Sequence, residues 1–166
     1  MIEFISDSPE MTSRLGKAIG EVIPPRTVLV LSGELGSGKT VFAQGLAHGL
    51  GVTEQVVSPT YTIAQTYEDG RLPFTHMDAY RLEGEDIYDI GLEEYWMNDG
   101  IAAIEWGDLL SPVLPADSIF IGFFRDGSDP DRDCDGKGCM TGKRKIVFDV
   151  ILGKYLWLEE VLACIS

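Results

Sequence analysis

Cysteine, basic residues and long apolar runs are all scarce in this sequence. Its three cysteines are an odd number, which favours reduced thiols over a disulfide framework. No stretch approaches the roughly 20 consecutive apolar residues of a membrane span, and the N-terminus lacks the basic and then apolar layout of a secretory signal. We therefore expect a cytoplasmic protein that does not associate with a membrane.

The charge balance is strongly acidic. Lysine and arginine number 13 against 27 aspartates and glutamates, which gives a formal net charge of −14. The electrostatic field of a negatively charged protein repels a polyanion at long range. The chain is therefore a poor candidate for binding nucleic acid without a partner protein. A nucleotide is not excluded, because a glycine loop and a metal ion neutralise phosphate locally.

One stretch, GELGSGKT from Gly33 to Thr40, fits the P-loop (Walker A) pattern G-x-x-x-x-G-K-[ST] without a gap. The apolar, β-branched residues 27–31 precede it, and residues 41–50 follow with helical spacing. Strand, glycine loop and helix therefore come in the order that a P-loop requires. A glycine-rich turn with a solvated lysine is the alternative interpretation.

Each residue type of the loop has a physical role in binding a nucleotide. Gly33, Gly36 and Gly38 allow backbone dihedrals that are closed to other residues, so that successive N–H groups converge on phosphate oxygens. The following helix presents its positive N-terminal end to the same anion. Lys39 reaches the β- and γ-phosphates as a point charge, and the Thr40 hydroxyl supplies one oxygen to Mg²⁺.

Before the loop, residues 2–5 have the pattern of a short strand. Ser8 and Pro9 are typical of an N-cap and a first helical position. We expect a helix from there to about Gly20, with these apolar residues facing the core: Leu15, Ala18, Ile19 and Val22.

Beyond the P-loop helix, the hydroxyl-rich residues 56–62 are where a nucleotide-sensing loop is expected. In many P-loop enzymes a threonine in this part of the chain meets Mg²⁺ or the γ-phosphate and orders its loop only in the triphosphate state. Thr60 is the candidate here. A proline turn that leads into a strand is the alternative.

Residues 63–67 and 73–77 alternate as two strands around a turn, which predicts a hairpin. Just beyond the return strand we expect a polar cluster at the sheet edge where ligands collect in α/β folds: His76, Asp78, Tyr80 and Arg81. Asp78 can hold Mg²⁺ through water or orient an attacking water, and Arg81 can pair with a carboxylate or phosphate. A salt-bridged turn explains the same residues.

Residues 83–96 suggest one or two short acidic helices, interrupted near Gly91. The apolar residues 101–105 then end in Glu105, which is the Walker B layout: a buried strand delivers a carboxylate to the metal edge of the P-loop. Glu105 is therefore the expected second protein group at Mg²⁺. Trp106 either covers the nucleotide or packs beneath it.

The C-terminal part is expected to add two paired strands, residues 118–124 and 145–151, and an amphipathic helix at residues 155–165. Five side chains of that helix are available for packing: Leu156, Leu158, Val161, Leu162 and Ile165. Between the strands lies a polar insertion, residues 125–144, which we expect to be exposed and mobile.

The insertion contains two weak metal patterns. Asp131, Asp133 and Asp135 resemble the opening of a calcium loop, but position twelve of that loop is Gly142 instead of a glutamate. Cys134 and Cys139 lack a second cysteine or histidine pair, so free thiols are favoured over a metal site.

A length of 166 residues with 45% apolar content, and no repeat or linker, predicts one domain over residues 1–166. The alternation of strands and helices predicts the fold class: an α/β P-loop NTPase three-layer sandwich, with a mostly parallel central sheet and antiparallel additions after the Walker B strand.

Four ordered motifs, taken together, are far more specific than the P-loop alone: GELGSGKT at 33–40, SPTYT at 58–62, H-x-D-x-Y-R-L at 76–82 and IEW at 104–106. They resemble the TsaE family, formerly called YjeE, of small bacterial P-loop ATPases in tRNA threonylcarbamoyladenosine biosynthesis. The resemblance implies that Lys39, Asp78 and Glu105 serve catalysis and that Thr40 and Glu105 bind Mg²⁺. It also implies these ATP-binding residues: Thr12, Glu34, Leu35, Gly36, Ser37, Gly38, Lys39, Thr40, Thr60 and Trp106.

The resemblance further implies ATP hydrolysis coupled to a complex with the proteins TsaB and TsaD. In that complex TsaD transfers the threonylcarbamoyl group to the adenosine beside the anticodon of tRNAs that read ANN codons, so tRNA is met only indirectly. Because the chain offers no obvious arginine finger, we expect the isolated protein to be a slow ATPase.

Two other functions are compatible with the same P-loop. A small nucleotide kinase should carry an acceptor pocket and an arginine-bearing lid, yet Arg71 and Arg81 are the only arginines between the P-loop and the insertion. A nucleotide switch that does not hydrolyse ATP and acts only as an interaction module is the second.

Overall fold

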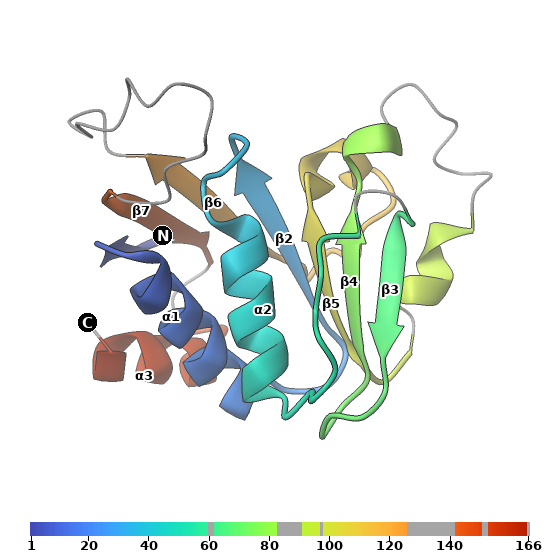
Figure 1. Cartoon of the computed structure of the whole chain (residues 1–166), viewed down its shortest axis with the longest axis horizontal. Coiled ribbons are helices and arrows are strands. Elements are labelled where there is room, and N and C mark those ends of the chain that lie inside the picture. Colours follow the sequence, from blue (N-terminus) through green and yellow to red (C-terminus); the bar gives the residue numbers. More distant parts are fainter. Residues whose placement is uncertain (60–61, 83–90, 97, 126–141, 151–152, 166) are drawn as a thin grey trace.

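A seven-stranded sheet in the order β1-β7-β6-β2-β5-β4-β3 forms the centre of the molecule (Figure 1). The structure is a computed structural model that describes residues 1–59, 62–82, 91–96, 98–125, 142–150 and 153–165. The strands are β1 Ile2–Ser6, β2 Thr27–Gly33, β3 Ala64–Tyr67, β4 Phe74–Asp78, β5 Ile101–Glu105, β6 Ile119–Arg125 and β7 Arg144–Asp149.

Three α-helices and three short 3₁₀ helices complete the described elements. The α-helices are α1 Pro9–Val22, α2 Lys39–Gly49 and α3 Leu156–Ile165, and the 3₁₀ helices are η1 Tyr80–Leu82, η2 Leu92–Tyr95 and η3 Gly107–Leu110. None of the described helices is long and apolar enough to cross a membrane.

The middle of the sheet is parallel and its two margins are antiparallel. β2 pairs with both β5 and β6 in parallel, and β4 extends the parallel set beside β5. β3 pairs antiparallel with β4, while β7 pairs antiparallel with β6 and with β1. The mixed α/β class is thus confirmed, but antiparallel pairing is as common as parallel pairing and also involves β1 and β3, which precede the predicted Walker B strand.

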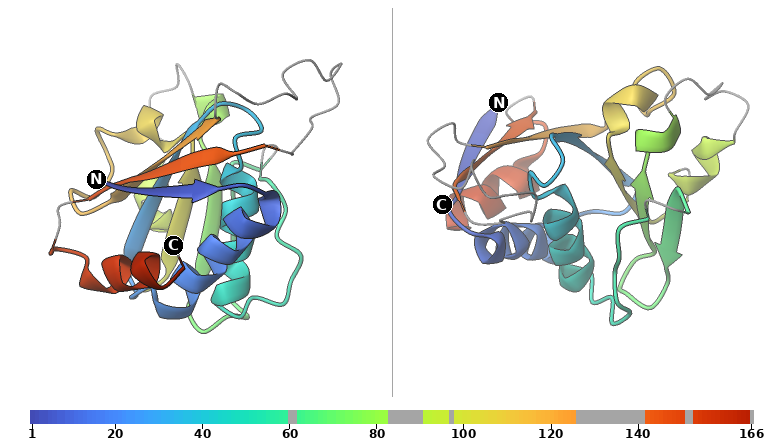
Figure 2. Two further views of the ribbon diagram at one scale, coloured as in Figure 1. Left: turned by 90° about the vertical axis from the view of Figure 1, so that its left-hand side faces the viewer. Right: turned by 45° about the horizontal axis from the view of Figure 1, so that its top comes forward.

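The alternation of side chains along the strands divides the core between two faces of the sheet. Leu29 and Leu31 of β2 belong to the cluster that α1, α2 and α3 cover, whereas Val28 and Val30 belong to the cluster on the opposite face. That second face is covered by the 3₁₀ helices and their connections, and the three α-helices all lie on the first (Figure 2). The predicted three-layer sandwich is therefore not confirmed among the described residues.

Helix α1 begins as the sequence predicts, because the Ser8 side chain accepts a hydrogen bond from Met11 N and Pro9 follows it. It continues two residues past Gly20, and Val22 is 48% exposed instead of buried. Glycines on the packed face of α1 let its backbone approach the backbone of α2 directly. A Cβ atom on Gly16 would lie 2.3 Å from Phe42 O, and one on Gly45 would lie 2.2 Å from Ser13 O.

Most of the other predicted elements are confirmed. β3 and β4 form the expected hairpin, and β6 pairs with β7. Within α3, Leu158 and Leu162 are buried, but Leu156, the first residue of the helix, is 62% exposed. Part of the predicted acidic helices and most of the insertion, including Asp131, Asp133, Asp135, Cys134 and Cys139, lie outside the described residues.

The polar cluster expected just beyond the hairpin is placed differently. His76 and Asp78 lie within β4, which runs to Asp78, while Tyr80 and Arg81 lie in the 3₁₀ helix that follows. Residues two apart in a strand face the same side of the sheet, so His76 and Asp78 both point to the face that carries α2. The Asp78 carboxylate therefore lies on the same face of the sheet as the His76 ring.

Candidate functional site

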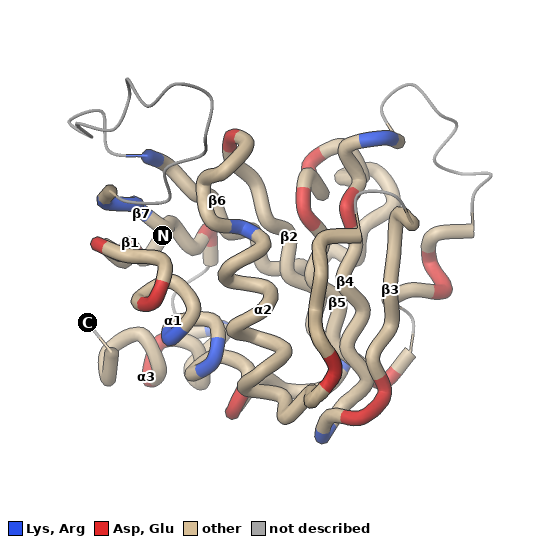
Figure 3. Tube along the Cα trace, in the orientation of Figure 1, with Lys and Arg blue, Asp and Glu red and all other residues tan. Residues whose placement is uncertain are grey.

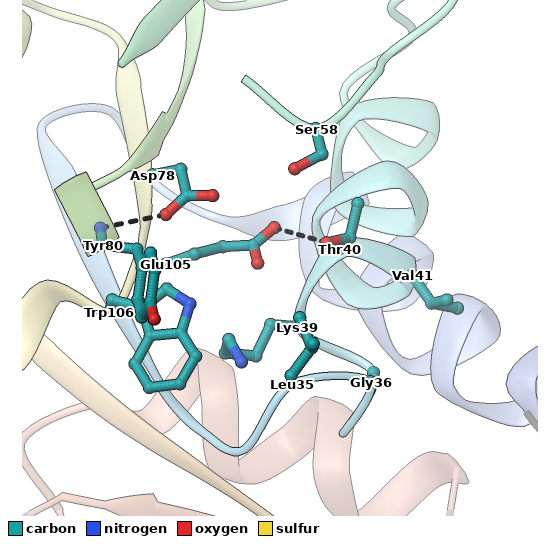
Figure 4. A pocket seen from close by; sticks show the side chains of 11 residues that line it. Leu35, Gly36, Lys39, Thr40, Val41, Ser58, Asp78, Tyr80, Glu105 and Trp106 are labelled. Carbon is teal, nitrogen blue, oxygen red and sulfur yellow. Dashed lines mark hydrogen bonds between the residues drawn. The ribbon is translucent and has the colours of Figure 1, made fainter. Parts of the chain in front are cut away.

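A cleft of about 330 Å³ lies at the carboxyl ends of the parallel strands, between the start of α2 and the ends of β4 and β5 (Figure 4). The residues that line it are Leu35, Gly36, Gly38, Lys39, Thr40, Val41, Ser58, Asp78, Tyr80, Glu105 and Trp106. Carboxyl ends of strands in open α/β sheets are where ligands bind, and this cleft brings the predicted P-loop and Walker B residues together.

The glycine loop forms one wall of the cleft. Gly33 comes so close to β6 that a Cβ atom would lie 2.4 Å from Phe123 O, and Gly38 has a left-handed φ of 108°. Gly38 is also the N-cap of α2 and gives the helix no side-chain cap. No side chain of the N-cap therefore occupies the first N–H donors of α2, and these donors remain available to an anion in the cleft.

Lys39 is folded back onto the loop. Its Nζ donates to Gly33 O at 2.7 Å and to Glu34 O at 2.9 Å, and it lies 4.3 Å from the centre of the Trp106 ring. Burial lowers the pKa of this ammonium group from 10.5, and the nearby Glu105, Asp78 and Asp108 partly oppose that shift. The site thus holds a poorly hydrated cation whose hydrogen bonds go to neutral groups.

Glu105 joins the two walls. Its Oε1 accepts from Thr40 Oγ1 at 2.7 Å (Figure 4). The same oxygen lies 2.9 Å from His76 Nε2 in the neighbouring strand. Thr40 is the second residue of α2, so this hydrogen bond ties the P-loop helix to β5. Thr40 and Glu105, each predicted to meet Mg²⁺, are therefore hydrogen-bonded to each other in the structure.

Asp78 lies beside Glu105 because the register of the sheet pairs these two residues at the ends of β4 and β5. Its Oδ1 accepts a hydrogen bond from Tyr80 N at 3.0 Å, and the side chain is buried yet lines the cleft. Two carboxylates and one ammonium group therefore share a small, largely desolvated volume, which is typical of a functional site.

Trp106 forms an aromatic wall with Tyr80, whose ring lies 5.2 Å away at an angle of 54°. The Trp106 backbone has a φ of 58°, which is uncommon for a bulky residue. Its N–H donates to Leu31 O at 2.9 Å, so the left-handed turn is fixed by β2. This conformation turns the chain sharply after Glu105 and places the indole over Lys39.

The other predicted nucleotide-binding residues lie in different surroundings. Glu34 and Leu35 are exposed, with Leu35 at 86%, and Ser37 is buried beneath the loop. The Thr12 hydroxyl lies 2.8 Å from Ser6 Oγ, and its methyl group faces Gly38. Thr12 is not among the residues that line the cleft, but it lines a smaller hollow beside it with Gly36, Gly38 and Val41. Thr60 lies outside the described residues.

Two residues at the site were predicted without a chemical role: His76 as a member of the polar cluster, and Arg125 as the first residue of the exposed insertion, whereas the structure places Arg125 at the end of β6. His76 is fully buried against Glu105, and Arg125 donates from Nη2 to Leu35 O at 3.3 Å and Gly36 O at 3.0 Å. The i, i+2 spacing of His76 and Asp78 could have predicted that both side chains point to the same face of the sheet. No local signal exists for Arg125, because its contact depends on β6 lying beside β2.

Charges around the cleft are distributed unevenly. Basic positions lie at the upper ends of β6 and β7, at the start of α2 and, with Arg81, just after β4 (Figure 3). Cationic groups therefore lie on both sides of the cleft, while the carboxylates of Asp78 and Glu105 end the two strands between them.

Fold and cleft together define a class: a mixed α/β protein in which a Walker A sequence and a strand ending in a carboxylate line one cleft. A crystal structure of YdiB from Bacillus subtilis matches the chain with a TM-score of 0.77 and 34% identity, over 98% of this chain and 94% of that one.

Sequence relatives identify the family. The family model described as threonylcarbamoyl adenosine biosynthesis protein TsaE matches residues 6–134. Proteins named tRNA threonylcarbamoyladenosine biosynthesis protein TsaE are similar: that of Bacillus subtilis is 39% identical over 94% of this chain and 90% of its own length, and that of Treponema pallidum is 42% identical over 70% and 87%. The chain belongs to the TsaE family.

Proposed function

We propose that the chain is a Mg²⁺-dependent subunit that binds and hydrolyses ATP, and that it is required to form the threonylcarbamoyl group on the adenosine next to the anticodon of tRNAs reading ANN codons. In this role it acts with TsaB and TsaD in the cytoplasm and meets tRNA only through the complex. Family membership supports the pathway. The observation that carries the ATPase activity is the meeting of Lys39, Thr40 and Glu105 in one cleft.

Phosphate binding is assigned to the glycine loop and Lys39. The uncapped start of α2 offers backbone N–H donors, and the hydrogen bonds of Lys39 go to neutral carbonyl groups. An anionic phosphate oxygen is a stronger partner for a buried ammonium group than a carbonyl oxygen is. Replacing the carbonyl partners of Lys39 by phosphate oxygens therefore favours binding of the nucleotide.

The oxygen atoms of Thr40 and Glu105 fit a magnesium site that leaves most coordination positions to water and phosphate. Within the described part of the chain, no group of three or more histidine, cysteine, aspartate or glutamate side chains could hold a metal ion. This supports a cation that arrives with its nucleotide. When bound, Mg²⁺ neutralises charge on the β- and γ-phosphate oxygens.

The Thr40 hydroxyl has lone pairs for a cation and a proton for Glu105, so the hydrogen bond to Glu105 is compatible with ligation. Asp78 is assigned to orient the attacking water, since its carboxylate lines the cleft beside Glu105. Hydrolysis also needs positive charge at the transition state, and an arginine supplied by a partner contributes roughly 10³–10⁵ in related nucleotidases. TsaB and TsaD are the proposed source of that charge or of the ordering it requires.

The proposal is tested by measuring phosphate release from ATP with and without TsaB and TsaD, in Mg²⁺ and in EDTA. We expect slow release by the parent alone, a faster rate in the complex, and none in EDTA or with Lys39→Ala. A panel of phosphoryl acceptors run in parallel separates hydrolysis from a kinase reaction. Transfer to an acceptor, or ATP binding with no release under any condition, would overturn the ATPase assignment.

A further inference from the structure

A histidine that takes no part in the proposed chemistry lies directly behind the Walker B carboxylate. His76 occupies the middle of β4 and is fully buried. Its ring stacks on Phe74 at 6.2 Å, and its Nε2 lies 2.9 Å from Glu105 Oε1. Its Nδ1 is buried without a hydrogen-bond partner among the described residues. A buried imidazole is costly unless its polar atoms are used, so the one hydrogen bond needs an explanation.

The two nitrogens determine which tautomer fits. If Nδ1 carried the proton, an N–H group would be buried without an acceptor and the Nε2 lone pair would face a carboxylate oxygen at 2.9 Å. If Nε2 carries it, the ring donates to Glu105 and leaves only a lone pair unused. An unused acceptor costs less than an unused donor plus a repulsive contact. The geometry therefore assigns the proton to Nε2.

This donor acts on the same oxygen as Thr40. Oε1 of Glu105 thus receives one hydrogen bond from α2 and one from β4, at 2.7 and 2.9 Å. No described residue donates to Oε2, and the close-up shows this oxygen turned away from Thr40 and toward Lys39, which also lines the cleft (Figure 4). Two donors from different elements prevent the carboxyl group from rotating, which leaves Oε2 directed at the ligand volume.

We propose that His76 is a positioning residue that fixes the Glu105 carboxylate so that Oε2 is presented to a divalent cation. The inference rests on the proposed Mg²⁺–nucleotide site and adds the group that orients its carboxylate. Partners of this kind, one step removed from a metal, typically change metal affinity or activity about 10- to 100-fold when removed. A histidine that merely fills the core would leave the requirement for Mg²⁺ unchanged.

The test compares two substitutions at His76. His76→Phe fills the space and keeps the stacking on Phe74 but removes the donor, whereas His76→Gln retains an N–H donor. Met77→Val is the matched control, because Met77 is equally buried in β4 and belongs to the core cluster on the opposite face. ADP affinity is titrated in EDTA and then at rising Mg²⁺, so that the Mg²⁺ concentration for half of the full effect is obtained.

We expect His76→Phe to bind ADP like the parent in EDTA but to need about 10-fold more Mg²⁺, with partial recovery in His76→Gln and no change in Met77→Val. An unchanged Mg²⁺ requirement in His76→Phe would make His76 a core residue only. Failure of the parent to bind nucleotide at any Mg²⁺ concentration would instead remove the proposed function.

A second measurement needs neither nucleotide nor a folded variant at His76. The chain has two histidines, His48 on the exposed side of α2 and His76, so their ring nitrogens are readily distinguished in a ¹⁵N-correlated NMR spectrum of the parent and of His48→Gln. We expect His76 to carry its proton on Nε2 and to shift when Glu105→Ala removes the acceptor. A proton on Nδ1, or a spectrum unaffected by Glu105→Ala, would overturn the proposal even if His76→Phe does not fold.

Discussion

The two walls of the cleft are built in different ways. The phosphate wall consists of consecutive residues from Gly33 to Thr40, and its shape comes from the backbone. The carboxylate wall consists of His76 and Asp78 from β4 and Glu105 from β5, and these residues meet only because the two strands pair in one register. One wall is therefore local in sequence, and the other is assembled by the sheet.

The two walls consequently depend on different features. The phosphate wall depends on glycine where the backbone is left-handed or crowded, as at Gly38 and Gly33. The carboxylate wall depends on strand parity, since a shift of one residue in β4 would turn His76 and Asp78 to the opposite face.

The largest effect is expected on the phosphate wall. Lys39→Ala removes the cation directed at the phosphates, and we expect the rate of ATP hydrolysis to fall at least about 10²- to 10³-fold, as for the loss of other donors to developing charge. Lys17→Ala is the matched control, because it removes the same side chain at a position of α1 that is 47% exposed and does not line the cleft. Both variants should fold. Hydrolysis by Lys39→Ala at the parent rate would show that the cleft is not the active site.

On the carboxylate wall we expect binding and turnover to separate. Asp78→Asn keeps the acceptor for Tyr80 N but lacks the charge that orients water, so turnover should fall about 10²-fold or more while nucleotide affinity changes little. Isothermal titration and single-turnover hydrolysis measure the two quantities. Equal losses in both would make Asp78 a ligand of the ground state.

The difference between the walls also explains how far the sequence predicts this site. The P-loop, its flanking strand and helix, the hairpin and the strand ending in Glu105 are all predicted from local patterns, because their periodicity and glycines are contiguous. The pairing of Asp78 with Glu105 and the burial of His76 depend on sheet register, which no single segment encodes. Val22 and Leu156 were wrongly expected in the core because helical spacing does not reveal where a neighbouring element ends.

Arg125 of β6 links the phosphate wall to the strand beside β2. Its guanidinium group donates to Leu35 O and Gly36 O, which turns the N–H groups of those peptide planes the other way. We expect Arg125→Met to weaken ADP binding in EDTA about 3- to 10-fold, because the bond to Gly36 O is worth roughly 0.5–1.5 kcal/mol and the longer contact to Leu35 O, at 3.3 Å, adds little. Arg26→Met is the control, since Arg26 pairs with Asp99 at the opposite end of β2. Equal ADP affinities would reduce Arg125 to a surface contact.

The smallest effect concerns stability and pH. Burial lowers the pKa of Lys39 below 10.5, so the folded state binds fewer protons there than the unfolded state does. Below the lowered pKa the buried charge disfavours folding in full, and above 10.5 this penalty is absent. The parent should therefore gain stability relative to Lys39→Met as pH rises through that interval. Urea unfolding of both proteins at several alkaline pH values measures the difference, and a constant difference would contradict the shift.

The backbone contact between α1 and α2 has a consequence for solvent exchange. Gly16 and Gly20 face α2, while Gly45 and Gly49 face α1, and a Cβ atom at any of the four would lie 2.1–2.3 Å from a backbone carbonyl oxygen of the other helix. Neither helix can open without exposing the other, so their central amides should exchange deuterium together, at the slow rate set by global unfolding. The amides from Gly33 to Gly38 should exchange faster until an anion binds. We therefore expect the loop to open locally, whereas the two helices below it should open only when the whole fold does.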